Sequence, residues 1–272
     1  MLVSTPIGNL GDLTPRARDA LRCADLILCE DTRHTAKLLA AIGVKAKLQP
    51  LHEHNEDAAI PAVLAQLREG RRVALVSDAG VPLVSDPGYR LVREALAEGL
   101  PVGALPGANA AILALVLSGL PPLPFLMMGF PPPRHAARRA AFGRIRAAER
   151  AGLAATLIWY EAPHRLAETL ADMANAFGSR PAAVARELTK RFEEVRRGSL
   201  PELAAHYRAQ EARGEVTIVV GLPEQEDVED LDERLRQALA GNSVKDAAAL
   251  VATATGLPRK LVYARALALS RG

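Results

Sequence analysis

Three short turns in the first 110 residues combine a rigid proline with glycine or another small residue. They lie at residues 5–10 (TPIGNL), 77–88 (SDAGVPLVSDPG) and 105–110 (LPGANA). Small residues let backbone N–H and C=O groups approach a ligand closely, and proline fixes the direction of the chain. One such turn is ordinary loop chemistry, whereas three of them predict a binding site built largely from backbone atoms.

Charged side chains lie beside these turns and at the ends of later apolar runs. Carboxylates at such places can accept protons, and arginine or lysine can hold an anion such as phosphate. Structural roles remain open for several of them, because Glu30 can compensate a helix start and Arg186 with Glu187 can form a strand-end ion pair. The polar candidates are Asp31, Arg33, His34, Asp86, Glu161, Arg165, Arg186 and Lys190.

The turns require strands that end where the turns begin. Apolar runs at residues 2–4, 26–29, 73–77 and 102–105 alternate with helical patterns, which predicts a parallel sheet covered by helices. Thr14-Pro15 and Asp31-Thr32 are typical helix starts. Ligands of open α/β sheets bind beyond the carboxyl ends of the strands, so the three turns and residues 30–33 are expected on one rim. No G-x-G-x-x-G follows the first run and no P-loop occurs, which argues against a dinucleotide or P-loop site.

The pattern changes after the proline-rich residues 119–124. Strands then outnumber helices, and some are close enough in sequence to pair antiparallel. Residues 224–233 hold seven acidic residues and no basic one, and two helical patterns around a short turn follow. We predict α/β domains at residues 1–120 and 121–223, then an acidic linker and a helix-turn-helix-like region at 224–272. That region either lays a helix on nucleic acid or packs against the body.

Composition places the chain among folded globular proteins. It has 272 residues, of which 49% are hydrophobic and 24% charged, with a net charge of +3. Two cysteines, Cys23 and Cys29, cannot build a disulfide framework, and no secretory leader opens the chain, so a cytoplasmic protein is expected. Residues 99–133 carry no charge, but prolines divide them into pieces too short for a membrane span.

Two further segments have charge patterns with more than one interpretation. The helical pattern at residues 134–150 carries six arginines and one glutamate, which is typical of phosphate contact and also of a solvated helix face. Residues 52–57 (HEHNED) gather histidines and carboxylates without a third ligand at a metal-binding spacing. No metal is therefore predicted, and a substrate loop or a plain polar loop is favoured there.

Seven ordered motifs together resemble the ribosomal RNA small subunit methyltransferase I family, within the tetrapyrrole methylase (class III methyltransferase) superfamily. Besides the three turns, these motifs are residues 30–35 (EDTRHT), 118–121 (SGLP), 160–165 (YEAPHR) and 186–190 (RELTK). The resemblance runs from residue 2 to about residue 222, and the tail is similar to the family's C-terminal region.

The resemblance implies two α/β domains of the tetrapyrrole methylase type, with S-adenosylmethionine bound in a cleft between them. Matching motif to motif places the family's cofactor positions on the three turns and on two later segments. These positions are Ile7, Gly8, Asp78, Ala79, Gly80, Leu83, Asn109, Ala110, Tyr160, Glu161 and Leu188.

The resemblance further implies methyl transfer to the ribose 2′-oxygen of a cytidine in the decoding region of 16S ribosomal RNA, by a homodimer acting on RNA or on the small subunit. A ribose hydroxyl is a poor nucleophile and gains from a proton acceptor. The catalytic candidates are Asp31, Glu161 and Lys190, with Asp31 or Glu161 as that acceptor. Candidate phosphate contacts are Arg33, Arg134, Arg138, Arg139, Arg165 and Arg186.

Three alternatives remain at this point. A relative within the superfamily would methylate a small molecule such as a tetrapyrrole precursor, but the many cations in the matched motifs favour RNA. A non-enzymatic nucleic-acid adaptor would use only the helical tail. A metal hydrolase would depend on residues 52–57.

Overall fold

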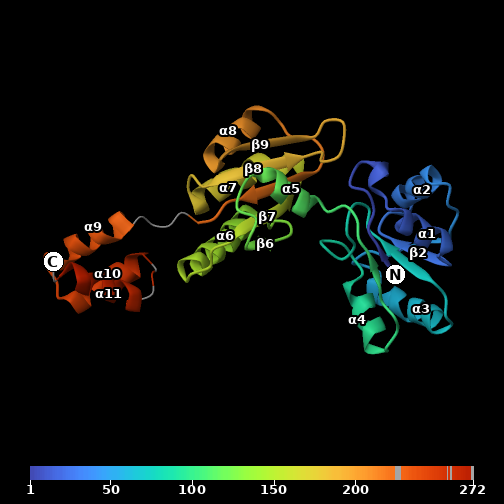
Figure 1. The fold of residues 1–272 in the computed structure, drawn as a ribbon, viewed down its shortest axis with the longest axis horizontal. Helices are drawn as coiled ribbons and strands as arrows, with labels where there is room; N and C mark the ends of the chain where they lie inside the picture. The colour runs from blue at the N-terminus through green and yellow to red at the C-terminus, as the bar shows by residue number, and fades with distance from the viewer. Residues whose placement is uncertain (224–227, 256, 258, 271–272) are drawn as a thin grey trace. The chain divides into compact units, whose positions relative to one another are not determined.

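The computed structural model describes residues 1–223, 228–255, 257 and 259–270, and the chain divides into two compact units (Figure 1). The first comprises Met1–Leu117 and Arg186–Glu194, and the second comprises Ser118–Ala185 and Val195–Gly272. The division at Ser118 lies close to the predicted boundary at residue 120. Segment Arg186–Glu194, however, groups with the first unit although it lies far along the chain.

The first unit contains a parallel five-stranded sheet. Its strands are β1 (Leu2–Val3), β2 (Leu26–Cys29), β3 (Leu48–Pro50), β4 (Val73–Val76) and β5 (Ala104–Leu105). Their order across the sheet is β3-β2-β4-β1-β5, and each neighbouring pair runs parallel. The predicted parallel sheet is confirmed, and β3 is an additional edge strand.

Helices cover both faces of this sheet. These helices are α1 (Pro15–Cys23), α2 (Thr32–Ala41), α3 (Glu56–Arg68) and α4 (Tyr89–Ala97). This part of the chain also forms η1 (Leu10–Asp12) and α5 (Ala110–Ser118). Ile27 and Cys29 of β2 pack in a core with α1 and α2, whereas Leu26 and Leu28 pack with α3 and α4. Figure 1 shows these two helix pairs on opposite sides of β2. Alternate residues of one strand therefore serve two cores, as in a doubly covered sheet.

Both predicted helix starts are confirmed. The Thr14 hydroxyl accepts a hydrogen bond from the Ala17 amide at 3.1 Å, and Pro15 occupies the first helical position of α1. The Asp31 carboxylate accepts from the Arg33 amide at 2.8 Å and so caps α2. Each side chain satisfies an amide that has no partner within its helix.

The second unit contains a mixed sheet. Its strands are β6 (Phe125–Met127), β7 (Thr156–Glu161), β8 (Pro181–Arg186), β9 (Glu194–Ser199) and β10 (Val216–Val220), in the order β6-β7-β10-β8-β9. Strand β10 pairs antiparallel with β7, which confirms the predicted change of sheet type, and β6 pairs parallel with β7.

Four helical segments belong to this sheet: α6 (His135–Arg150), η2 (Pro163–Arg165), α7 (Leu166–Phe177) and α8 (Leu200–Ala209). Their core centres on three aromatic rings. Phe142 of α6 lies 5.8 Å from Trp159 of β7 and 5.5 Å from Phe177 of α7 between ring centroids. Tilted and edge-on contacts of this kind stabilise a core beyond the area that they bury.

The tail folds into three helices: α9 (Val228–Leu239), α10 (Val244–Thr255) and α11 (Arg259–Leu269). Leu235, Val251 and Val262 are buried in a core that the tail makes by itself. The two predicted helices are confirmed, while residues 224–227 of the acidic block and Gly256 of the predicted turn lie outside the described residues. Among the described helices, none has the length and apolar character needed to cross a membrane.

Candidate functional site

Backbone hydrogen bonds join the first turn to the second. The Thr5 amide donates to the Gly80 carbonyl at 2.9 Å, and the Gly80 amide donates back to the Thr5 carbonyl at 3.2 Å. Two buried hydroxyls reinforce this bridge: Thr5 Oγ1 donates to the Ser77 carbonyl at 3.1 Å, and Ser77 Oγ donates to the Gly80 carbonyl at 2.9 Å. The ends of β1 and β4 are therefore fixed to each other.

The third turn packs against the other two. Ser4 Oγ donates to the Leu105 carbonyl at 2.9 Å, and a Cβ placed on Gly107 would lie only 2.6 Å from Ser4 Cβ. Gly80 has a φ of 83°, and a Cβ there would lie 3.4 Å from both the Ala108 carbonyl oxygen and Ile7 Cγ2. The predicted convergence of the three turns is confirmed, and it depends on residues without side chains at the points of contact.

Segment Arg186–Glu194 lies over the first turn. A Cβ placed on Gly8 would overlap the Lys190 side chain and would lie 3.0 Å from Thr189 Oγ1. Lys190 Nζ pairs with the Glu187 carboxylate at 2.8 Å, and Leu188 is buried. The Thr189 hydroxyl is buried and has no hydrogen-bond partner in the part of the chain that the structure describes. An unpartnered buried hydroxyl is costly, so this atom is suited to a ligand.

Carboxylates gather where β2 and β4 end. The Asp31 amide donates to Asp78 Oδ1 at 3.3 Å, which ties the two strand ends together. Burial, followed by the charges of Glu30 and Asp78, raises the pKa of Asp86 to about 7. Burial and the nearby Asp78 and Glu53 charges also raise the pKa of Glu30. Burial and the repulsion between these carboxylates favour binding of protons or cations at the ends of β2 and β4.

Asp31 has little capacity left to accept a proton. Its Oδ1 accepts from the Arg33 amide at 2.8 Å and from Arg33 Nε at 3.2 Å, and its Oδ2 accepts from Nη2 at 2.9 Å. The Arg33 side chain, followed by the Arg33 amide, lowers the pKa of Asp31 to about 2. A carboxylate held in this way is a weak base at neutral pH.

Glu161 is fully engaged by its own unit. The buried carboxylate accepts from the Ala162 amide at 2.7 Å and from Thr169 Oγ1 at 2.5 Å. Arg165 Nε lies 3.1 Å from Oε1, and Nη2 donates to Oε2 at 3.2 Å. This network fixes the end of β7 against η2 and α7. The neighbouring Tyr160 is half-buried beside Phe130, with 5.7 Å between ring centroids.

Nine of the predicted cofactor positions lie in the first unit, namely Ile7, Gly8, Asp78, Ala79, Gly80, Leu83, Asn109, Ala110 and Leu188, and two, Tyr160 and Glu161, lie in the second. Asn109 Oδ1 accepts from the Ile112 amide at 3.0 Å, which makes it a cap for α5. Leu83 has a φ of 73°, an unusual conformation for a residue with a side chain.

The predicted phosphate contacts divide into three groups. Arg134 and Arg139 are exposed and form no ion pair with any described residue. Arg33, Arg165 and Arg186 each pair with a carboxylate, those of Asp31, Glu161 and Glu194 respectively. Arg138 is only 1% exposed, and its Nε and Nη2 lie 2.7 and 2.6 Å from Asp172 Oδ2.

The prediction that Arg138 contacts phosphate is therefore wrong. Arg138 shares a helix face with the buried Phe142 and Glu149, whereas its sequence neighbour Arg139 faces water. Residues three to four positions apart lie on the same side of a helix. Arg138 therefore lies on the face of α6 that is buried.

This difference between neighbours predicts unequal responses to lysine. Arg138→Lys loses part of the forked contact with Asp172 and the bond from Nη1 to the Pro133 carbonyl. We expect the free energy of unfolding to fall by about 1–3 kcal/mol in urea titrations. Arg139→Lys is the matched control and is expected to change it by less than about 0.5 kcal/mol. Equal stability of both variants would contradict the buried pairing.

Residues 52–57 form a turn that leads into α3. Asn55 Oδ1 accepts from the His52 amide at 2.8 Å, and Asn55 Nδ2 donates to the Pro50 carbonyl at 3.1 Å. The His52 and His54 rings are 6.1 Å apart between centroids. Within the described residues, no group of three or more histidine, cysteine, aspartate or glutamate side chains is arranged to hold a metal ion.

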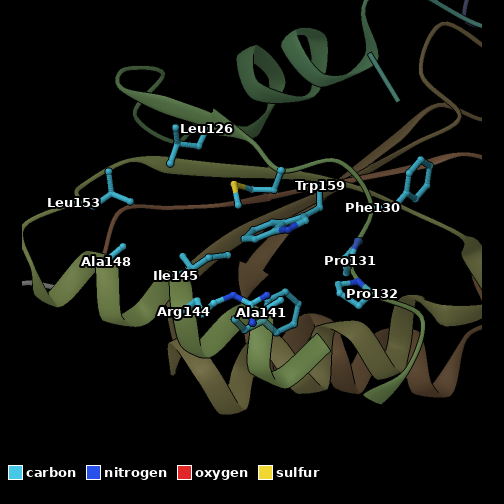
Figure 2. Close-up of a pocket in the computed structure, with 12 residues that line it drawn as sticks. Leu126, Phe130, Pro131, Pro132, Ala141, Arg144, Ile145, Ala148, Leu153 and Trp159 are labelled. Carbon is cyan, nitrogen blue, oxygen red and sulfur yellow. The ribbon is translucent and has the colours of Figure 1, made fainter. Parts of the chain in front are cut away.

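A pocket of about 350 Å³ lies in the second unit between β6, β7 and α6. Figure 2 shows Trp159 of β7 and Ile145 of α6 pointing into it, with Phe130 and Pro131 at one end. Arg144 is the one charged side chain in its lining. None of the predicted cofactor positions lines this pocket.

Two parts of the chain match known families. Residues 1–204 match the family described as Tetrapyrrole (Corrin/Porphyrin) Methylases, and residues 225–270 match the RsmI C-terminal HTH domain.

Solved structures share the fold at low sequence identity. Uroporphyrin-III C-methyl transferase from Thermus thermophilus, complexed with S-adenyl homocysteine, is 20% identical with a TM-score of 0.53, over 80% of this chain and 95% of that one. Diphthine synthase is 14% identical with a TM-score of 0.59, over 81% of this chain and 88% of that one. At these identities the likeness establishes the fold alone.

Curated relatives are much more similar. Proteins named ribosomal RNA small subunit methyltransferase I are 48% identical in Micromonospora olivasterospora, over 96% of this chain and 84% of the relative, and 44% identical in Escherichia coli O157:H7, over 98% and 93%. The relative of the same name in Mesorhizobium japonicum is 45% identical over 98% and 91%. With the joined turns, the matched tail and this similarity along both chains, the protein belongs to the ribosomal RNA small subunit methyltransferase I family of tetrapyrrole methylases.

Proposed function

We propose that the protein transfers a methyl group from S-adenosylmethionine to the ribose 2′-oxygen of a cytidine in the decoding region of 16S ribosomal RNA. The observation that carries this proposal is the similarity over nearly the full length to relatives named for small-subunit ribosomal RNA. The protein is a methyltransferase of the S-adenosylmethionine-dependent type. The exact nucleotide and the oxygen that receives the methyl group are the proposed part.

The first unit fits this cofactor in three respects. Gly8, Gly80 and Gly107 have no side chains, which lets the turns and the Lys190 segment pack closely and brings their backbone groups together. The buried Thr189 hydroxyl is available for a hydrogen bond. The Asp78 carboxylate suits a ribose hydroxyl or the ammonium group of the cofactor. When bound there, S-adenosylmethionine supplies a methyl group activated by a positively charged sulfur.

The protein's own residues then have separate tasks. We assign cofactor binding to Ile7, Gly8, Asp78, Ala79, Gly80, Leu83, Asn109, Ala110, Tyr160, Glu161 and Leu188. Lys190, held beside Gly8 by Glu187, provides positive charge near the substrate oxygen as it becomes negative. Holding the reacting atoms in line supplies much of the rate in such a displacement.

Phosphate contact is assigned mainly to Arg134 and Arg139, because their charges are not neutralised by a described carboxylate. Arg33, Arg165 and Arg186 already pair with carboxylates, so each would have to bind an RNA phosphate in addition to its carboxylate or in place of it. Such contacts make affinity fall steeply with salt, so binding to RNA should be measured across a salt series.

A small tetrapyrrole substrate is the weaker alternative. It depends on structural neighbours at 22% identity or less, which share the fold with this chain. We also propose that the protein works as a homodimer in the cytoplasm, where its substrate is assembled. Exposed apolar side chains around β6, including Leu123 and Phe130, support an interface between copies. Light scattering of the purified protein tests the dimer.

The decisive test is methylation of small ribosomal subunits that lack this modification. Subunits are incubated with cofactor carrying a labelled methyl group, and the product is digested and mapped by mass spectrometry. Label on the ribose of one cytidine is expected. Label on a base, or transfer to free tetrapyrrole precursors in preference to subunits, would contradict the proposal.

A further inference from the structure

The residue that takes the proton from the substrate hydroxyl is not settled by the motifs. Attack of a hydroxyl oxygen on the methyl carbon breaks the carbon–sulfur bond, and the electron pair of that bond goes to sulfur. The hydroxyl proton must leave at the same time or earlier, to a base on the protein or to water. The following inference rests on the proposed transfer to a ribose hydroxyl.

The predicted acceptors are occupied by other contacts. Asp31 uses both oxygens to hold Arg33, and Glu161 accepts hydrogen bonds from three residues within its own unit. Lys190 carries a proton already in its pair with Glu187. All three side chains are therefore engaged in contacts with other residues of the chain.

Asp86 differs from them in its contacts. It is half-buried and makes no hydrogen bond or ion pair with any residue that the structure describes. It lies on the second turn, which is held near one end by the bond between Ser77 and Gly80 and at the other by Gly88, where a Cβ would overlap Leu75. The loop therefore holds the Asp86 carboxylate in position, and its oxygens are not needed for structural hydrogen bonds.

The charges around Asp86 also suit a base. Glu30, from the end of β2, and Asp78, from the same turn, act on it with negative charge, and Glu30 in turn lies near Asp31, Glu53 and His52. Burial and these charges bring the pKa of Asp86 to about 7. A proton acceptor works best when its pKa lies near the working pH.

We propose that Asp86 is the proton acceptor of the methyl-transfer step. The hydroxyl proton passes to its carboxylate as the oxygen–carbon bond forms, and the neutral acid then releases the proton to water. Glu30 and Asp78 are positioning residues in this scheme, since they act on the reaction through Asp86. Asp31 and Glu161 hold the ends of β2 and β7.

Asp86→Asn in the full chain tests this role, because the amide keeps the shape and cannot take the proton. We expect single-turnover transfer to undermodified small subunits to fall at least 100-fold, while cofactor affinity measured by calorimetry stays within about threefold. Wild-type transfer should rise with pH through about 7, because only the ionised carboxylate accepts a proton, and this rise should vanish in the variant. Asp86→Glu retains a base and should recover at least a tenth of the rate.

The matched control is Asp19→Asn, which removes one negative charge from an exposed ion pair with Arg22 in the same unit and should change neither rate nor pH profile. Asp86→Asn with a wild-type rate and an unchanged pH profile would overturn the proposal. Loss of cofactor binding in parallel with transfer would also overturn it, because Asp86 would then be a binding residue. Methyl label on a base in the wild type would instead defeat the proposed function, so the two failures are distinguishable.

Discussion

Gly80→Val is expected to abolish cofactor binding while the protein stays folded. Gly80 bridges the first and second turns with a φ of 83°, and a Cβ would lie 3.4 Å from Ile7 and from the third turn. The two γ-methyl groups of valine extend beyond that Cβ into the space where the turns meet. Calorimetric titration with S-adenosylmethionine should show affinity reduced by at least about 100-fold, close to 3 kcal/mol.

The control for this variant is Gly70→Val. Gly70 has nearly the same conformation, with a φ of 78°, but a Cβ there meets no atom within 4 Å. Both variants therefore carry the strain of a branched side chain at positive φ, about 1–3 kcal/mol of stability. Only Gly80→Val should lose cofactor. Wild-type affinity in Gly80→Val, or equal losses in both variants, would contradict the location of the site.

Local sequence signals were sufficient for most of the first unit. Short apolar runs followed by proline and glycine identify the ends of β1, β4 and β5, because parallel strands bring such ends to one rim. Strand β3 is not predicted from the sequence, because Leu48–Pro50 has only three residues and contains a proline. The strand forms at the edge of the sheet, where a proline is tolerated.

Other features of the site depend on contacts between distant residues. Nothing near residue 186 indicates that segment Arg186–Glu194 groups with the first unit and lies over Gly8. Glu187 and Thr189 adopt positive φ values of 51° and 65° although neither is glycine. No local sequence pattern therefore predicts this backbone conformation. The buried Thr189 hydroxyl and the free carboxylate of Asp86 are visible only after the chain has folded.

Charge was the least reliable guide, because a charged side chain can be buried when a partner is available. Arg138 and Glu149 of α6 pair with Asp172 and Arg180 inside the second unit. Their spacing from Phe142 is helical, and that period was the available signal of burial. The sequence pattern of α6 predicts an exposed basic surface, for phosphate contact or for solvent, whereas the helix buries Arg138 and Glu149.

Three exposed cations of the described part of the tail are expected to bind RNA. Its sequence has seven basic residues, but Arg265 pairs with Asp232 at 2.6 Å and Arg236 with Glu233 at 3.6 Å. Lys245, Arg259 and Lys260 are exposed and make no ion pair with a described residue. All three lie in the first turn of α10 or α11. Positive charge at a helix start opposes the helix dipole, so their presence there favours an external anion as partner.

Replacing Lys245, Arg259 and Lys260 together by alanine should therefore weaken binding to small ribosomal subunits without changing cofactor affinity. Each phosphate contact contributes about 0.7–0.9 to the slope of log K against log salt, so the slope should become shallower by about 2–3. At low salt we expect a loss of about 100-fold in filter-binding assays. The control variant replaces Arg22, Arg71 and Arg93 by alanine, which removes the same total charge. These three arginines pair with acidic residues of the first unit.

The salt slope separates this role from the tail's other possible task. Electrostatic contact with phosphate changes both the slope and the affinity, whereas a tail that only packs against the body changes neither when its exposed cations are removed. A triple variant with the wild-type slope would therefore assign α10 and α11 to folding. If the control variant also shows a shallower salt slope, the net charge of the protein attracts the RNA. Three paired arginines of the first unit would then affect the salt slope as much as the three tail cations do.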